Sequence, residues 1–152
     1  MLLSDGDRIR GLLGTYCRLI DAGDFAGVGA LFARATLRDP SGTVIATGAA
    51  EAEALYAAIT QRHQDGTPRT QHLVTNTTFD EGTGEDEAVA RSSYVVLQGL
   101  PGGALQPIVA GSYVDTFARD AGGWHFTDRT FTVGLTGDLS RHLTIDPSGA
   151  PS

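Results

Sequence analysis

The chain has 152 residues and a formal net charge of −7, with 11 Lys and Arg residues against 18 Asp and Glu residues. This length predicts one domain over residues 1–152. The basic residues are scattered and form no positive stripe for a phosphate backbone, which excludes nucleic acid and anionic membrane surfaces as expected partners.

The cysteine content and the apolar runs restrict the chain further. Cys17 is the sole cysteine, so neither an intrachain disulfide nor a thiolate metal cluster can form. No apolar run reaches the roughly 20 residues of a membrane span, and the first ten residues, MLLSDGDRIR, lack the long apolar core of a secretory signal. We therefore expect a cytoplasmic protein.

The first expected helix covers about residues 4–22. Ser4 followed by Asp7 resembles a capping box, Gly23 is a stop signal, and Asp24 then caps a short second helix, FAGVGALFA. The apolar residues of the first helix recur at the spacing of a buried helical face: Ile9, Leu12, Leu13, Tyr16, Cys17, Leu19 and Ile20.

A hairpin, a third helix and four strands follow. ATLRDPSGTVIATG has two β-prone runs around a Pro-Ser-Gly turn, and AAEAEALYAAITQRH is rich in helix formers. Four β-type segments are then predicted near residues 70–80, 87–99, 105–119 and 123–135. Helices followed by an antiparallel meander indicate an α+β domain, with three N-terminal helices packed on a strongly curved, mostly antiparallel sheet.

Polar residues occur on both faces of these strands. One face of TQHLVTNTTF carries His72, Val74, Asn76 and Thr78, and one face of the last strand carries Arg129. A concave sheet that lines a partly polar ligand pocket would show this pattern. A sheet with one face in water would show much of it too, so both interpretations stay open.

The chain resembles the SnoaL-like members of the nuclear-transport-factor-2-like superfamily, on several motifs that together cover residues 8–143. These are LLGTYCRLIDAGDFAGVGALF, TQHLVTN, GSYVDTF, GGWHFTDRTF and GDLSRHL. The superfamily includes scytalone dehydratase, ketosteroid isomerase, polyketide cyclases and bile-acid 7α-dehydratase. The resemblance implies a cone-shaped α+β barrel with a core over about 8–143 and a flexible tail at 144–152, and it leaves the reaction open because the fold hosts several activities.

The dehydratase-like branch implies a catalytic trio. Tyr16 and Asp21 match a tyrosine and an aspartate of its first helix, with the same five-residue step as in the bile-acid dehydratase, and His72 matches a histidine of its first long strand. Arg129 matches an arginine of the last strand. The bile-acid dehydratase also carries an acid on the strand after its histidine, where this sequence has Tyr94 and two valines, so the substrate or the step is expected to differ.

The trio suits proton transfer without a cofactor or metal. Histidine can take a proton from carbon near neutral pH, and an aspartate on its other ring nitrogen fixes the tautomer. Tyr16 could hydrogen-bond a carbonyl or protonate a departing hydroxyl. Five residues turn a helix about 140° past one full turn, so Tyr16 would enter the pocket from the side of the helix and Asp21 from its end.

Further residues complete the predicted site. Arg129 is expected to bind an acidic substrate group or to pair with Asp21, and Asn76 to hold a substrate oxygen. Tyr94 and Tyr56, the latter on the third helix, are expected to contact the substrate as well.

The predicted function is a dehydratase or isomerase for a small hydrophobic carbonyl or hydroxy-carbonyl metabolite of polyketide- or steroid-like type. A non-catalytic small-molecule-binding domain, and a polyketide cyclase or hydrolase, are the alternatives. A homodimer is expected, with a trimer as the other option. The outer sheet surface would supply the apolar contact through Tyr113, Phe117, Phe126 or Phe131.

The remaining histidines take no part in the predicted site. His63 lies in a polar loop and is expected to be solvated. His125 and His142 are too far apart in the pattern to predict a metal site.

Overall fold

The computed structural model of the chain describes residues 1–145. Its first element is helix α1 (Asp5–Asp21), which Ser4 caps as predicted. The Asp7 backbone N–H donates to Ser4 Oγ over 3.1 Å, and the Ser4 backbone N–H donates to Asp7 Oδ2 over 3.2 Å. This reciprocal pair satisfies two of the amide groups that a helix start leaves unbonded.

Two further helices pack against each other. Helix α2 (Phe25–Leu31) begins at the predicted cap Asp24, whose side chain accepts from the Gly27 backbone N–H. Helix α3 (Gly48–Ile59) ends four residues earlier than the sequence pattern predicts, because Thr60 is extended and forms a β-bridge with Leu143.

The six strands form one sheet in the order β2-β1-β6-β5-β4-β3. The four long strands run as the predicted antiparallel meander, whereas β1 lies parallel to β6, a pairing that the sequence pattern did not indicate. Their bounds are β1 Thr36–Arg38, β2 Val44–Thr47, β3 Thr70–Phe79, β4 Glu87–Gln98, β5 Gln106–Asp120 and β6 Gly123–Thr136.

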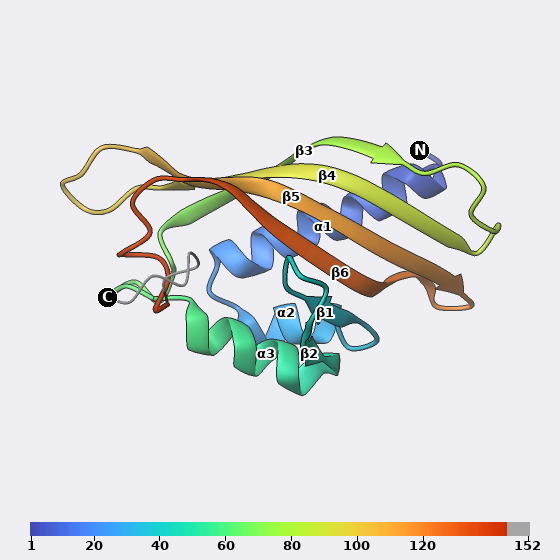
Figure 1. Cartoon of the computed structure of the whole chain (residues 1–152), viewed down its shortest axis with the longest axis horizontal. Helices are drawn as coiled ribbons and strands as arrows, with labels where there is room; N and C mark the ends of the chain where they lie inside the picture. The colour runs from blue at the N-terminus through green and yellow to red at the C-terminus, as the bar shows by residue number, and fades with distance from the viewer. Residues whose placement is uncertain (146–152) are drawn as a thin grey trace.

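The helices cover one face of the strongly curved sheet, as expected for the α+β cone. Figure 1 shows α1 running across this face, with α2 and α3 below it in this view. The buried side of α1 presents Ile9, Leu13, Tyr16, Cys17 and Ile20 to the sheet. The end of α1 thus meets the concave face of the sheet, and the candidate functional site lies at this meeting point.

Two register shifts change which residues face the core. In β3 the pairing with β4 slips between Thr75 and Thr78, and Asn76 there has a positive φ of 54°. In β6 the pairing with β5 slips so that both Phe126 and Arg129 are buried, although simple alternation puts them on opposite faces. Each extra residue in a strand reverses the faces beyond it.

The aromatic residues proposed for an outer dimer surface lie elsewhere. Tyr113, Phe117 and Phe126 are 5%, 0% and 0% exposed and belong to the core, and Phe131 is partly buried against it. That assignment was wrong because these residues occupy the concave face that the helices cover. The homodimer itself stays a prediction from the sequence.

Helices α1, α2 and α3 are the helices of residues 1–145, and none of them combines the length and apolar character that crossing a bilayer requires. Of the tail predicted at 144–152, residues 146–152 lie outside the part of the chain that the structure describes.

Candidate functional site

Asp21 and His72 form a hydrogen-bonded pair where α1 ends beside β3. Asp21 Oδ1 lies 2.6 Å from His72 Nδ1, and Asp21 Oδ2 accepts from the His72 backbone N–H over 2.8 Å. Thr70 adds a third contact, because its hydroxyl donates to Asp21 Oδ1 over 2.9 Å. The structure thus brings together two of the predicted catalytic residues and adds Thr70, which the sequence did not single out.

The local structure explains why an acid sits at this helix end. A carboxylate near a helix C-terminus meets the negative end of the helix dipole, so it needs compensating donors. Asp21 is the last residue of α1, and the three donors of Thr70 and His72 provide that compensation. Strand β3 is at the edge of the sheet, so the carboxylate also satisfies a backbone N–H that no neighbouring strand receives.

Tyr16 lies behind His72, inside the fold. The two rings meet edge to face with centroids 6.0 Å apart, and Tyr16 is only 4% exposed. Burial, together with the nearby phenols of Tyr113 and Tyr56, raises the pKa of Tyr16 well above its ordinary value. The Tyr16 hydroxyl therefore stays protonated at neutral pH and is available as a hydrogen-bond donor.

Arg129 is enclosed in the same interior, where it pairs with Asp115. Its Nε and Nη2 donate to the two carboxylate oxygens of Asp115 over 2.6 and 2.9 Å. The guanidinium carbon lies 4.4 Å from the Tyr16 ring centre and 3.9 Å from that of Tyr113. The suggested pairing of Arg129 with Asp21 was wrong, because the register of β5 and β6 sets Asp115 directly opposite Arg129.

Protonation in this ion pair follows from burial and mutual charge. Burial raises the pKa of Asp115, and the Arg129 charge opposes that change. Burial alone would lower the pKa of Arg129, but the Asp115 carboxylate outweighs it and holds that pKa well above its ordinary value. The guanidinium therefore stays charged inside an aromatic enclosure, which makes it a source of positive potential for the interior.

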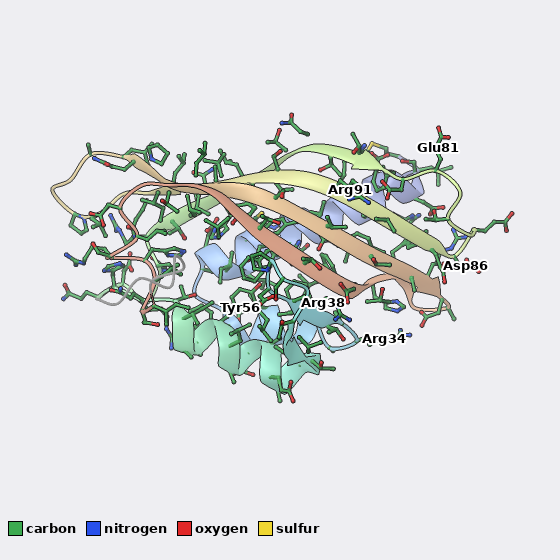
Figure 2. All side chains as sticks on the ribbon, in the orientation of Figure 1. Arg34, Arg38, Tyr56, Glu81, Asp86 and Arg91 are labelled. Atoms are coloured by element: carbon green, nitrogen blue, oxygen red, sulfur yellow. The ribbon has the colours of Figure 1, made fainter. Side chains whose placement is uncertain are left out.

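The two other predicted tyrosines also reach the interior. Tyr56 projects from the side of α3 that faces the sheet (Figure 2) and lies 6.0 Å from Tyr16, centre to centre. Tyr94 stacks on Tyr113 at 4.4 Å, and its hydroxyl donates to the Thr132 carbonyl over 3.2 Å. Tyr56 is thus next to the trio, whereas the Tyr94 hydroxyl is already engaged by the backbone.

Asn76 does not belong to this cluster. It is exposed and sits at the register shift of β3 with a left-handed backbone conformation. The prediction that it shares the face of His72 was wrong, because the bulge turns it outward. Thr77 takes the inward position instead and shares a hydrogen bond of 2.9 Å with Ser92.

A groove lies between α1 and β3, next to the Asp21–His72 pair. Its volume is about 620 Å³, and we call it the α1–β3 groove. Tyr16 is not part of its wall, so the pair stands between this groove and the interior tyrosines. The lining residues are Arg10, Leu13, Gly14, Cys17, Arg18, Asp21, Gln71, His72, Leu73, Val74, Thr75 and Thr77.

Cys17 fits the sequence interpretation of a small buried side chain. Burial raises the pKa of its thiol to about 11, which keeps the thiol protonated at neutral pH. Within residues 1–145, no group of three or more His, Cys, Asp or Glu side chains is arranged to hold a metal ion.

Two buried residues of this region were missed by the sequence analysis. Asp115 lies opposite Arg129 in the pairing of β5 with β6, and this partner could only be found from the strand register. His142 lies in a segment without periodicity, and its ring centre is 6.2 Å from that of His72. The spacing of histidines along the chain gave no signal for this contact.

The fold is an α+β cone that holds an Asp–His pair, a phenol and an arginine. These features place the protein in a class of small domains with an interior polar site. The SnoaL-like domain model matches residues 1–130. The chain therefore belongs to the SnoaL-like domain family, as the resemblance implied.

Solved structures agree with this fold. Rv3472 from Mycobacterium tuberculosis, of unknown function and solved as a single-residue variant, is 23% identical with a TM-score of 0.68, over 96% of this chain and 77% of that one. An NTF2-like protein with a cystatin-like fold from Novosphingobium aromaticivorans is 22% identical with a TM-score of 0.69, over 90% and 86% of the two chains.

A candidate scytalone dehydratase from the same species is 20% identical with a TM-score of 0.68, over 88% and 87% of the two chains. These identities are low, so the likenesses establish the fold and not an activity. None of the curated proteins matches the sequence.

Proposed function

We propose that the protein is a cofactor-independent acid–base enzyme, a dehydratase or isomerase, that removes a proton from the carbon beside a carbonyl group of a small hydroxy-carbonyl metabolite. The observation that carries the proposal is the Asp21–His72 pair, with 2.6 Å between Oδ1 and Nδ1. One of the solved structures of similar fold is a candidate scytalone dehydratase, and this likeness supports a dehydratase reaction for the present protein.

The pair would make His72 a directed base. A carboxylate on Nδ1 selects the tautomer that carries its proton there, which leaves the lone pair of Nε2 for the substrate. Within residues 1–145, Nε2 of His72 has no hydrogen-bond partner, while Asp21 is fixed by His72 and Thr70. A base held in one orientation loses little entropy when it takes the proton.

Tyr16 would act on the oxygen of the substrate. Its phenol is protonated and lies in a dry interior, where a donor to developing negative charge is more effective than in water. The Arg129 guanidinium, 4.4 Å from the centre of the Tyr16 ring, would stabilise negative charge on that phenol or on an acidic substrate group.

In the dehydration, His72 Nε2 takes the proton and the C–H electron pair becomes the new carbon–carbon double bond. The carbon–oxygen bond of the hydroxyl breaks, and Tyr16 donates the proton with which that oxygen leaves as water. The phenolate then regains a proton from the His72 imidazolium, which restores both groups. In the isomerisation, the imidazolium returns the proton to another carbon instead.

A binding domain without turnover is the second candidate, and one observation favours it. His72 and Asp21 line the α1–β3 groove, but Tyr16 does not. A ligand held in that groove would meet the base without the phenol and could be retained unchanged.

The cytoplasmic location and the homodimer, or a trimer, remain predictions from the sequence.

Deuterium exchange tests the proposal without knowledge of the natural substrate. A panel of hydroxy-carbonyl and enone compounds is incubated with the protein in heavy water, and loss of the α-hydrogen and of water is followed by proton NMR. His72→Ala is expected to lower the exchange rate by roughly 10²–10⁴-fold, the usual contribution of a general base. His125→Gln, a histidine change outside the site, is the matched control.

Equal exchange rates for His72→Ala and the wild type would remove His72 from the reaction. Compounds that bind the wild-type protein without any exchange would favour the binding domain.

A further inference from the structure

The segment that follows β6 closes back over the interior. The Gly137 backbone N–H donates to the Ile108 carbonyl over 2.8 Å, and the Thr144 backbone N–H donates to the Ile59 carbonyl over 2.9 Å. The C-terminal segment 137–144 is therefore tied to β5 at one end and to the end of α3 at the other. His142 lies between these two ties.

Contacts on both sides of His142 fix its backbone. The Gln61 backbone N–H donates to the His142 carbonyl over 2.8 Å, and the Gln61 side chain donates to the carbonyls of Ser140 and Leu143 over 2.8 and 2.6 Å. Gln98 donates to the Arg141 carbonyl over 3.0 Å. The backbone position of His142 is thus set by Gln61, just after α3, and by Gln98 of β4.

The His142 ring is buried against the proposed base. His142 is 5% exposed, and its ring centre lies 6.2 Å from that of His72. Within residues 1–145, His142 Nδ1 is buried and has no hydrogen-bond partner. His63 differs, because its Nε2 lies 3.0 Å from the Arg141 carbonyl. A structural histidine normally gains such a partner, since a buried polar atom without one costs free energy.

We propose that His142 is a second imidazole of the site, which holds a substrate oxygen by a hydrogen bond while His72 takes the proton from the neighbouring carbon. This inference deepens the proposed function and rests on it. It assigns a role to the C-terminal segment, which carries a substrate-contacting residue into the interior.

The surroundings of His142 keep its ring neutral. Burial lowers its pKa to about 4, the His72 and His63 imidazoles act in the same direction, and Asp21 opposes them. A neutral imidazole has one N–H donor and one acceptor nitrogen, so His142 can donate to an oxygen without first being protonated. Neutral donors of this kind stabilise an enolate oxygen in other enzymes.

The two histidines would therefore divide the work. His72, oriented by Asp21, accepts the proton, and the electron pair of the broken C–H bond moves toward the carbonyl oxygen. His142 donates to that oxygen as its negative charge develops. When the electron pair returns from the oxygen, the hydroxyl leaves as water with the proton that Tyr16 donates, or the His72 imidazolium returns its proton to another carbon. His142 donates a hydrogen bond throughout and keeps its own proton.

The probe for this inference is 4-nitrophenol, whose phenolate oxygen imitates an enolate and whose absorbance reports binding. Histidine ring signals of the nitrogen-15-labelled protein are followed during the titration. We expect the His142 signals to shift with probe concentration. We expect His142→Phe to weaken binding roughly tenfold, or about 1.4 kcal/mol, whereas His142→Gln, which keeps an N–H donor, loses less. His125→Gln is the matched control and should bind as the wild type does.

Unchanged His142 signals at saturating probe, equal affinity of His142→Phe and the wild type, or no binding to the wild type would each overturn the inference. The NMR titration uses the wild-type protein, so it decides the matter even if His142→Phe does not fold. A His142 that responds to the probe, in a protein without deuterium exchange, would support an oxygen-binding role and contradict the proposed catalysis.

Discussion

Asp21 contacts His72 twice, at the ring through Nδ1 and at the backbone through its N–H. One carboxylate therefore fixes both the strand edge and the imidazole that the strand carries. The end of α1 and the start of β3 are joined by the same groups that would orient a base. The position of His72 in the fold and its proposed role as a base therefore depend on the same hydrogen bonds to Asp21.

Asp21→Asn tests the charge of this residue. The amide can still accept from a donor, but it removes the negative charge that stabilises the His72 imidazolium and can favour the wrong tautomer. We expect kcat/KM for deuterium exchange to fall by roughly 10²–10⁴-fold. Thr70→Val, which removes one neutral hydrogen bond to Asp21 and no charge, should lower it less than about tenfold. A larger loss in Thr70→Val than in Asp21→Asn would contradict this ranking.

Asn76 provides a test of the register shift in β3. Its φ of 54° suits glycine and asparagine, so Asn76→Gly should leave the fold and the exchange rate nearly unchanged. Asn76→Val should lower the free energy of unfolding by roughly 1–3 kcal/mol in urea denaturation, because a β-branched residue is strained there. A large loss of activity in a stable Asn76→Gly would return Asn76 to the site.

These positions show which parts of the fold the sequence could predict. The helices and the meander follow from periodicity and capping, both of which are local, so the Ser4 cap and the Asp24 cap were found. Asp21 and His72 were found through family motifs, and their distance of 2.6 Å agrees with the pairing proposed for them. A capping signal acts over a few residues, and so does the helical period.

Features that depend on register were not predicted. A strand has a period of two, so one extra residue reverses every later side chain, and the sequence does not mark the bulges beside Asn76 and Phe126. The Asp115–Arg129 pair depends on which residues of β5 and β6 stand opposite each other. The contact of His142 with His72 depends on a segment whose course is set by tertiary hydrogen bonds.

The buried ion pair is expected to dominate the effect of substitutions at Arg129. Arg129 and Asp115 are 1% and 0% exposed, so Arg129→Met leaves a carboxylate in the core without its partner. We expect the free energy of unfolding to fall by about 3–5 kcal/mol in urea denaturation. The double variant Asp115→Leu with Arg129→Met should recover much of that loss. If the double variant is less stable than Arg129→Met, the penalty does not come from the unpaired carboxylate.

The stability of the protein should depend on pH through His142. Its pKa is about 4 in the folded protein, below the ordinary value of 6.5, so the unfolded chain binds a proton here first as the pH falls. The stability contribution is therefore complete above pH 6.5 and is lost progressively between about pH 6.5 and pH 4. The loss amounts to about 2–3 kcal/mol at the lower end.

The measurement compares wild type and His142→Phe by urea denaturation at neutral pH and near pH 4.5. The charged and titratable groups around His142, namely His72, His63 and Asp21, are kept in both proteins, so the difference between the two curves isolates His142. We expect the wild type to lose more stability on acidification than His142→Phe does, by about 2–3 kcal/mol. Parallel curves would show that the ring takes up its proton as readily in the folded protein as in the unfolded chain. In that case His142 would be charged in mild acid, and the neutral donor assigned to it would be confined to higher pH.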